Sequence, residues 1–362
     1  MPETFNSALP GEQQSIRRGA WVDALPEPGS VVVRVGDSAS LLRDLAPESV
    51  DCVITSPPYW GHRDYSAGGI GQEPTVQGYV EALLSVFEPL QKALKPTGSF
   101  WLNLGDTYRS KRLQGIPWRV AIAMVDEQDW ILRNDVIWNK VKGSPDNAKD
   151  KLRNLHEHIF HFVKDPKKAY YDVDAIRRPP RAATERNGKV QSATGVSGTR
   201  YRRQIELSTV LSETEKVAAM SALDEMMQSV KAGEISDFRM VIRGVHRVTH
   251  SDSVRLSGRA KELADRGFYF LKYHPKGAKP SDIWEIIPED THGREAHYAA
   301  YPEALCEIPI QATCPPDGLV LDPFLGTGTT LVVAKRLGRR ALGIDISKEY
   351  AAIAEARIKE VA

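Results

Sequence analysis

Two short segments of this chain combine residue types that together can do chemistry. The first, at residues 56–59, reads Ser-Pro-Pro-Tyr and directly follows an apolar run. Because successive prolines fix φ and lack an amide hydrogen, their carbonyls remain as acceptors without a local competitor. The Ser56 hydroxyl and the Pro57 carbonyl can therefore both accept hydrogen bonds from one NH2 group, while the Tyr59 ring offers a face for stacking. Two such acceptors turn the lone pair of a conjugated amine toward an electrophile.

The second segment, at residues 322–330, reads Asp-Pro-Phe-Leu-Gly-Thr-Gly-Thr-Thr and also follows an apolar run. Gly326 and Gly328 leave a turn without side chains, so a ligand can approach the backbone closely. Asp345 ends the next expected strand, where a carboxylate commonly accepts hydrogen bonds from ribose hydroxyls. This pattern is typical of a nucleotide-binding turn.

Each segment also has a structural interpretation. Residues 56–59 are equally typical of a rigid turn in front of core aromatics. The glycine turn alone fits a purely structural role, because short motifs often mislead. The two segments together, each at the end of a strand, favour one shared site.

These segments must be positioned by alternating strands and helices. The hydrophobic periodicity predicts both kinds of element along most of the chain. The expected strands cover residues 31–35, 50–54, 99–104, 131–138, 156–163, 318–324 and 341–344, and the expected helices cover residues 40–45, 79–94, 117–126, 212–231, 329–337 and 348–359. Residues 95–98 (Lys-Pro-Thr-Gly) are expected to separate a helix from the strand that follows. Such alternation predicts an α/β fold with a mostly parallel sheet.

Three histidines lie close together at His156, His158 and His161. A helical metal site needs its ligands on one face, and Phe160 stands where the HExxH pattern requires histidine. The segment is therefore interpreted as a strand, and no metal site is predicted. The three cysteines, Cys52, Cys306 and Cys314, form no CxxC pair, which argues against a disulfide framework or a zinc site and favours a cytoplasmic protein.

The net charge of +1 gives no global field that would recruit nucleic acid, so any such surface must be local. Residues 175–280 carry many Arg residues among Gly, Ser, Thr and Pro. Composition alone indicates a basic insertion, and a solvated surface loop is its alternative. Residues 1–30 are interpreted as a polar N-terminal arm without the features of a signal peptide, and no apolar run is long enough to span a membrane.

At these motifs the chain resembles the bacterial and archaeal-type DNA amino-methyltransferases of the permuted beta group. Residues 55–60 resemble the catalytic motif of that family, and residues 322–330 resemble its S-adenosylmethionine motif. Residues 343–345 match the ribose-binding strand end, and residues 35–37 match the segment that contacts adenosine. Residues 297–305 resemble the segment against the methionine part of the cofactor, although Tyr301 stands where Phe is commoner.

The resemblance implies a class I, Rossmann-like, S-adenosylmethionine-dependent methyltransferase domain, circularly permuted, with helices on both faces of the sheet. It divides the chain into a catalytic half at 31–174, a target-recognition region at 175–280 and a cofactor-binding half at 281–362. It implies double-stranded DNA as a partner, with a cognate restriction endonuclease acting separately as a further candidate. A monomer and a homodimer both remain open.

The resemblance also assigns roles to individual residues. Catalytic roles fall on Ser56, Pro57, Pro58 and Tyr59. Cofactor binding falls on Asp37, Tyr301, Pro302, Asp322, Phe324, Gly326, Gly328, Thr329, Thr330 and Asp345. DNA contacts are expected from Trp60, Arg177, Arg178, Arg181, Arg200, Arg202, Arg203, Arg243 and Arg247.

The favoured activity is methylation of cytosine N4 in a short DNA sequence by base flipping and direct transfer. Ser56 before the two prolines favours cytosine, whereas Asp there would favour the same-class alternative, adenine N6. A DNA-binding protein with a decayed catalytic site is the alternative from another class. Carbon-5 methylation is not favoured, because none of the cysteines follows a proline as that reaction requires.

Overall fold

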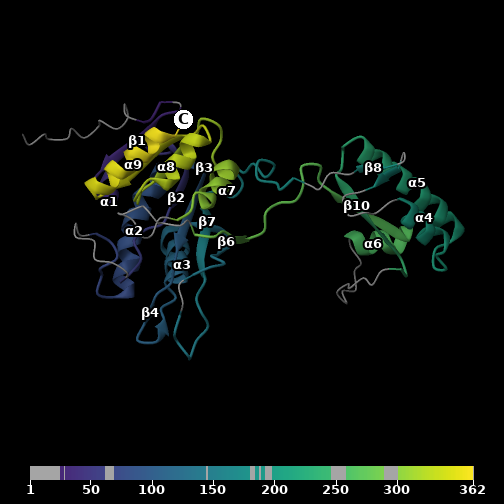
Figure 1. Ribbon diagram of the computed structural model, residues 1–362, viewed down its shortest axis with the longest axis horizontal. Helices are drawn as coiled ribbons and strands as arrows, with labels where there is room; N and C mark the ends of the chain where they lie inside the picture. The colour runs from purple at the N-terminus through teal and green to yellow at the C-terminus, as the bar shows by residue number, and fades with distance from the viewer. Residues whose placement is uncertain are drawn as a thin grey trace, which may run out of the picture. The chain divides into compact units, whose positions relative to one another are not determined.

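A computed structural model describes residues 25–27, 29–61, 69–143, 146–179, 184–186, 189–191, 198–245, 258–288 and 301–361 (Figure 1). The chain divides into two compact units: a large one, Met1–Asp172 with Ser281–Ala362, and a small one, Val173–Pro280. Most of the expected N-terminal arm and residues 297–300 lie outside the described residues.

The large unit is built on one eight-stranded sheet in the order β1-β14-β13-β2-β3-β7-β6-β12. Its strands are β1 (Val31–Val35), β2 (Val50–Thr55), β3 (Leu94–Leu104), β6 (Ile131–Asn139), β7 (His156–Val163), β12 (Ile283–Glu285), β13 (Leu319–Asp322) and β14 (Arg340–Asp345). Only β7 runs antiparallel to its neighbours, β3 and β6. The expected mostly parallel sheet is therefore confirmed, and segments from both ends of the chain meet at its centre, where β13 pairs with β2.

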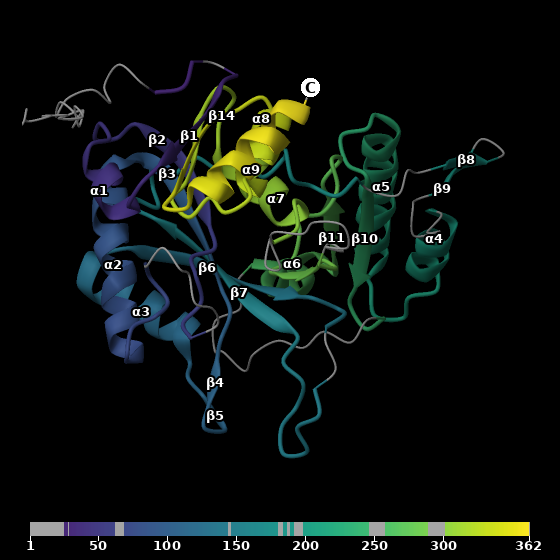
Figure 2. The same cartoon turned by 60° about the vertical axis from the view of Figure 1, so that its left-hand side comes forward.

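Helices cover both faces of this sheet (Figures 1 and 2). They are α1 (Ser38–Arg43), α2 (Val76–Ala93), α3 (Ile116–Gln128), α7 (Ala304–Thr313), α8 (Thr329–Arg336) and α9 (Lys348–Glu360). Strand residues alternate between the two layers, since Val53 packs with α1, α2 and α3, whereas Cys52 and Ile54 pack with α7, α8 and α9. The alternation explains why β2 is buried along nearly its whole length.

Most of the expected elements are present. The strands at 31–35 and 156–163 have the predicted bounds, and the other predicted elements of the sheet layers differ mainly at their ends. The largest difference is β3, which begins at Leu94 rather than at residue 99. The reason is tertiary pairing, because Leu94 pairs with Val50 and the Lys95 ammonium lies 2.7 Å from the Asp51 carboxylate.

The small unit has its own hydrophobic core around α4 (Gly198–Glu206), α5 (Glu213–Lys231) and the antiparallel pair β10 (Asp237–Ile242) and β11 (Phe268–Tyr273). It also contains α6 (Gly258–Arg266) and the pair β8 (Thr184–Arg186) and β9 (Lys189–Gln191). The predicted helix at 212–231 is confirmed with its capping box, in which Ser212 and Glu215 satisfy each other's backbone amides. Composition concealed the remaining elements, since β10 and β11 interleave Arg and Lys with apolar residues.

Within the described residues, no helix is long and apolar enough to cross a membrane.

Candidate active site

The predicted site residues converge because parallel strands end at one edge of the sheet. Val35 pairs with Asp345 at the ends of β1 and β14, and Leu321 pairs with Val53 near the ends of β13 and β2. The segments that follow these strands, although separated by more than two hundred residues in sequence, therefore lie side by side. In open α/β sheets this carboxyl edge is where ligands bind.

The Asp322 side chain links the two motifs by hydrogen bonds. Its side chain is fully buried, and its two carboxylate oxygens accept hydrogen bonds from Thr55 Oγ1 at 2.6 Å and Thr330 Oγ1 at 2.6 Å. The Phe324 amide and the Tyr301 hydroxyl add bonds of 3.1 and 3.2 Å. Burial raises the pKa of Asp322, and these donors oppose that rise. Asp322 and Thr330 were expected to bind the cofactor, which stays a prediction; in the structure both are buried, and their hydrogen bonds fix the turn.

The glycine turn is held by the carboxylate at the end of β14. Gly326 has a left-handed φ of 53°, and its amide donates to Asp345 Oδ2 at 2.8 Å. The Ser347 amide donates to Oδ1 of the same carboxylate at 2.8 Å. Partial burial raises the pKa of Asp345, while the two amides lower it. Each oxygen retains a lone pair, so Asp345 can still accept hydroxyl groups of a ligand.

The other predicted cofactor residues are placed in different ways. Phe324 and Tyr301 are partly exposed beside the turn, whereas Pro302, Gly328 and Thr329 are buried. Asp37 is exposed at the N-terminus of α1, where it accepts the Ser40 amide at 2.9 Å. Burial lets Pro302, Gly328 and Thr329 shape the site, and their direct contact with the cofactor stays a prediction.

In the catalytic motif, the two proline carbonyls differ in their surroundings. The Tyr79 hydroxyl donates to the Pro58 carbonyl at 2.8 Å, which fixes the turn against α2. Among the described residues none donates to the Pro57 carbonyl, so this oxygen remains an acceptor. Ser56 is partly exposed beside it.

A polar network lies behind Tyr59. Its hydroxyl donates to Glu157 Oε2 at 2.6 Å and receives the Asn103 amide at 2.9 Å. Asn103 Nδ2 also donates to Glu157 Oε2 at 2.9 Å and to Ser56 Oγ at 3.3 Å. The Lys140 ammonium pairs with the other oxygen of Glu157. Burial and the neighbouring Glu157 charge raise the pKa of Tyr59 well above its ordinary value, so the hydroxyl stays protonated.

Sequence reasoning missed Asn103, Lys140 and Glu157. A signal was present, since Asn103 interrupts the apolar run of the expected strand at 99–104 and Glu157 is the one acidic residue of the expected strand at 156–163. Both are buried, and a buried carboxylate requires partners. The partners could not be identified from spacing, because Glu157 and Tyr59 are 98 residues apart.

Trp60 was expected to contact DNA, which stays a prediction, and in the structure its side chain has a structural role. Its side chain is only 4% exposed and belongs to the core of the large unit. The indole nitrogen donates to the Glu73 carbonyl at 2.8 Å, and the Arg109 guanidinium lies 5.0 Å from the ring centroid. Trp60 therefore anchors the catalytic turn from the inside.

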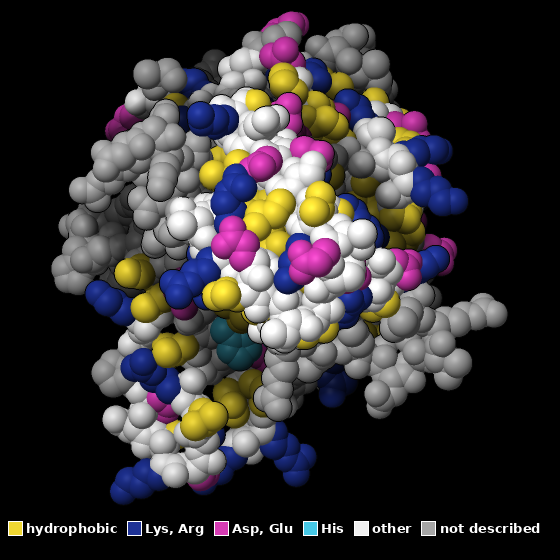
Figure 3. Space-filling view, turned by 90° about the vertical axis from the view of Figure 1, so that its right-hand side faces the viewer, with side chains coloured by type: hydrophobic (Ala, Val, Ile, Leu, Met, Phe, Trp, Pro, Cys, Tyr) yellow, Lys and Arg dark blue, Asp and Glu magenta, His cyan; other side chains and the backbone are white. Residues whose placement is uncertain are grey.

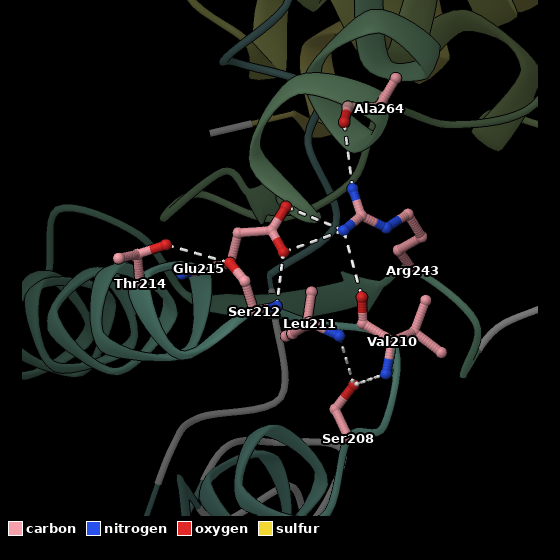
Figure 4. A network of polar contacts seen from close by, with 8 residues as sticks. All are labelled: Ser208, Val210, Leu211, Ser212, Thr214, Glu215, Arg243 and Ala264. Carbon is pink, nitrogen blue, oxygen red and sulfur yellow. Dashed lines mark hydrogen bonds and ion pairs between the residues drawn. The ribbon is translucent and has the colours of Figure 1, made fainter.

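Several arginines of the small unit that were expected on DNA are instead used internally. Arg177 bonds Asp174 at 2.7 Å and the Gly277 carbonyl at 2.8 Å. Figure 4 shows the Arg243 guanidinium between the Glu215 carboxylate, at 2.8 and 2.9 Å, and backbone carbonyls. Arg202 pairs with Asp224. These three side chains stabilise the unit, and their expected contacts with DNA stay predictions.

Three other arginines of this region, Arg178, Arg200 and Arg203, are exposed. Arg200 and Arg203 line an open groove of about 620 Å³ together with Leu207 and Val245. On the face shown in Figure 3, Lys and Arg side chains are interspersed with Asp and Glu and form no continuous basic surface. Arg181 and Arg247 lie outside the described residues.

The cysteines are unsuited to nucleophilic chemistry. All three are buried and free. Burial raises the pKa of Cys52 to about 12 and also raises those of Cys306 and Cys314, so their thiols stay protonated. Among the described residues there is no group of three side chains arranged to hold a metal ion.

A sheet with one antiparallel strand near its edge, helices on both faces and a glycine turn at the carboxyl edge define the chain as a class I methyltransferase fold. The model of the DNA methylase family matches residues 50–356, and the chain belongs to this family of amino-methyltransferases. It is therefore a DNA methyltransferase whose cofactor is S-adenosylmethionine, and DNA is its substrate.

Individual relatives agree with this assignment. The chain is 30% identical to the type II methyltransferase M.SfiI of Streptomyces fimbriatus, over 87% of this chain and 88% of the relative. It is 28% identical to the type II methyltransferase M.SmaI of Serratia marcescens, over 91% of both chains. Among solved structures, the PvuII cytosine-N4-specific DNA methyltransferase has the same fold, with a TM-score of 0.55 and 20% identity over 92% of this chain and 89% of that one.

The described residues fit S-adenosylmethionine. The partly exposed Gly326 backbone and Phe324 ring lie beside Asp345, whose carboxylate retains acceptor capacity for ribose hydroxyls. The exposed Asp37 carboxylate follows the neighbouring strand β1. A glycine turn with two carboxylates on the neighbouring strand ends suits a ligand that carries hydroxyl groups and a positive charge.

Proposed function

We propose that this enzyme methylates N4 of cytosine within a short DNA sequence, after the base has been flipped out of the duplex. The observation that carries the proposal is the pair of acceptors, Ser56 Oγ and the Pro57 carbonyl, at the strand end adjacent to the glycine turn. An exocyclic amine is inaccessible within the duplex, so the base must leave the stack to reach them.

In this proposal the hydrogen-bond network determines which way the Ser56 hydroxyl points. The Tyr59 hydroxyl donates its hydrogen bond to Glu157, so the Tyr59 oxygen can accept a hydrogen bond from the Ser56 hydroxyl at 3.3 Å. Ser56 Oγ then faces the substrate with a lone pair rather than a hydrogen. The target amine therefore finds two acceptors, the Pro57 carbonyl and the Ser56 Oγ lone pair that does not accept from Asn103.

Bound S-adenosylmethionine supplies an electrophilic methyl group on its sulfonium. Ser56 and Pro57 hold the amine hydrogens so that the nitrogen lone pair is directed toward the glycine turn, and Tyr59 stacks on the base. Base–aromatic stacking contributes about 1–3 kcal/mol per base. The nitrogen loses a proton after it has become cationic, so a strong general base is not required, and no enzyme nucleophile takes part.

Ser before the two prolines supports cytosine rather than adenine. The name of the structural relative from the PvuII system, cytosine-N4-specific, supports the same choice. The relatives named type II methyltransferases support a role in restriction–modification, with an endonuclease acting separately. The small unit, with its exposed Arg178, Arg200 and Arg203, is proposed to recognise the target sequence.

The decisive experiment is mass spectrometry of nucleosides from DNA methylated by the purified enzyme, followed by methylation-aware sequencing to locate the site. We expect N4-methylcytosine in one short sequence context, and its loss in the Ser56→Ala variant. N6-methyladenine would establish the same-class alternative, and 5-methylcytosine would overturn the mechanism. Failure to bind S-adenosylmethionine would favour a decayed enzyme.

A further inference from the structure

Two excursions of the large unit border the catalytic motif. One is the hairpin β4 (Tyr108–Arg109) and β5 (Arg112–Leu113), which follows the end of β3. The other connects β6 to β7 and is described at residues 140–143 and 146–155. Both begin beside the site, since the Thr107 hydroxyl donates to the Trp60 carbonyl at 3.2 Å and Lys140 pairs with Glu157.

The two excursions brace each other. The Lys111 ammonium lies 2.9 Å from the Asp150 carboxylate, and the Lys151 ammonium lies 4.7 Å from the centroid of the Tyr108 ring. In both ribbon views they project from the same end of the large unit (Figures 1 and 2). They form one paired surface element, which we call the basic fingers, residues 108–113, 140–143 and 146–155.

The basic fingers concentrate positive charge in a nearly neutral protein. Residues 108–113 and 140–155 contain eight Lys and Arg and two Asp, whereas the whole chain has a net charge of +1. Four of these cations, Arg112, Lys142, Lys149 and Arg153, form no ion pair with any described residue and are exposed. Such uncompensated charge beside a DNA-modifying site is complementary to the phosphate backbone.

The second of the basic fingers carries an apolar side chain, Leu152, that the described residues leave exposed. Leu152 is 90% exposed, the highest value for any large hydrophobic residue in the described part of the chain. It lies between Lys151 and Arg153, so the flanking cations bring it to the duplex. Apolar side chains on proteins that distort DNA insert between base steps.

We propose that the basic fingers grip the duplex beside the target nucleotide and that Leu152 enters the base stack, in the gap left by the flipped base. The inference rests on the base flipping in the proposed function. It assigns DNA contacts to the catalytic unit itself, in addition to those proposed for the small unit. Lys149 and Arg153 contact phosphates, and Leu152 replaces the stacking that the neighbouring bases lose.

The test of Leu152 uses duplexes that contain the mapped target, with 2-aminopurine next to the target base as a fluorescent reporter of unstacking. Wild-type enzyme should raise the fluorescence, and Leu152→Ala should raise it less and methylate the paired duplex about tenfold more slowly. Mismatching the target base should bring the turnover of the variant close to that of wild type, because less stacking and pairing must be broken. Ile122→Ala, an apolar position on α3 that is 53% exposed, is the control.

The two proposals fail in distinguishable ways. Unchanged fluorescence with a wild-type enzyme that still methylates would overturn base flipping, and the role of Leu152 with it. A normal wild-type response that Leu152→Ala shares, with equal turnover on paired DNA, would overturn only the role of Leu152. An equal loss of turnover for Leu152→Ala on paired and on mismatched DNA would also contradict the role of Leu152.

The cations have a separate test. Lys149→Gln and Arg153→Gln should each reduce the slope of log affinity against log salt by about one, as expected for one lost phosphate contact. Lys359→Gln is the matched control, because it lies in the last turn of α9, a helix that starts at the carboxyl edge of the sheet and runs away from it. Unchanged slopes in both variants would show that the basic fingers do not contact DNA.

Discussion

Glu157 is the single residue whose charge determines the arrangement of the catalytic motif. It accepts the Tyr59 hydroxyl at 2.6 Å, and Lys140 compensates its charge. Glu157→Gln keeps the shape of the side chain but introduces an NH2 group that can donate toward Tyr59 and reverse the direction of the hydrogen bonds. Because a hydrogen bond to a charged group contributes about 1.5–3 kcal/mol, we expect turnover to fall roughly ten- to hundredfold.

The effect should be confined to the chemical step. S-adenosylmethionine affinity, measured by calorimetry, should be unchanged, because Gly326 and Asp345 follow or end β13 and β14, which β2 and β3 separate from the strand β7 that carries Glu157. Glu355→Gln, on an exposed position of α9, is the control for an equivalent change elsewhere. Wild-type turnover in Glu157→Gln would show that the network has no part in orienting Ser56.

Asp345 gives the corresponding prediction for the cofactor. Asp345→Ala removes the acceptor for ribose hydroxyls and also releases the Gly326 and Ser347 amides. We expect S-adenosylmethionine to bind about ten- to hundredfold more weakly in calorimetry, as for lost bonds to a charged group. Asp126→Ala, exposed on α3, should leave the affinity unchanged. Equal affinity in both variants would place the ribose elsewhere.

At the scale of elements, the close packing of α8 on α9 depends on one glycine. Gly328 begins α8 with a φ of 83°, and a Cβ atom there would lie 2.8 Å from the Ala354 Cβ. Gly328→Ala therefore combines backbone strain with a steric clash, and overpacking typically costs about 1–3 kcal/mol. Gly338→Ala has a φ of 69° but no atom within 4 Å, so it reports the strain alone.

Urea unfolding should show a larger loss of stability for Gly328→Ala than for Gly338→Ala. Adding Ala354→Gly should be non-additive with Gly328→Ala, because the two residues share one contact. Equal losses of unfolding free energy in the two single variants would mean that the contact between α8 and α9 at Gly328 adds no steric cost.

Sequence patterns predicted the elements better than the exposure of individual side chains. Short apolar or β-branched runs placed β1 and β2, and alternating faces placed β7, since local hydrophobicity determines which of these residues are buried. A motif, however, states which residues lie together and not which of them face the ligand. The motifs therefore assigned Asp322 to the cofactor and Trp60 to DNA, although tertiary packing buries both side chains. The Glu157 network depends on pairing between distant strands, which no local pattern contains.

At the scale of the whole molecule, the two compact units suggest a division of labour. The motifs for cofactor and amine all lie in Met1–Asp172 and Ser281–Ala362, whereas Val173–Pro280 has a separate core. Separate cores allow one unit to change without disturbing the packing of the other. If Val173–Pro280 recognises sequence, specificity should be transferable between relatives.

Replacing Val173–Pro280 with the corresponding segment of M.SfiI tests this transfer, because that relative aligns over 87% of this chain. We expect the chimera to methylate the sites of M.SfiI, as read by methylation-aware sequencing, with unchanged S-adenosylmethionine affinity. Base contacts carry sequence choice, while phosphate contacts carry affinity, so the basic fingers of the large unit should still supply salt-dependent binding. The chimera with Ser56→Ala is the control for loss of chemistry without loss of binding. A folded, active chimera that kept the original target would assign recognition to the large unit instead.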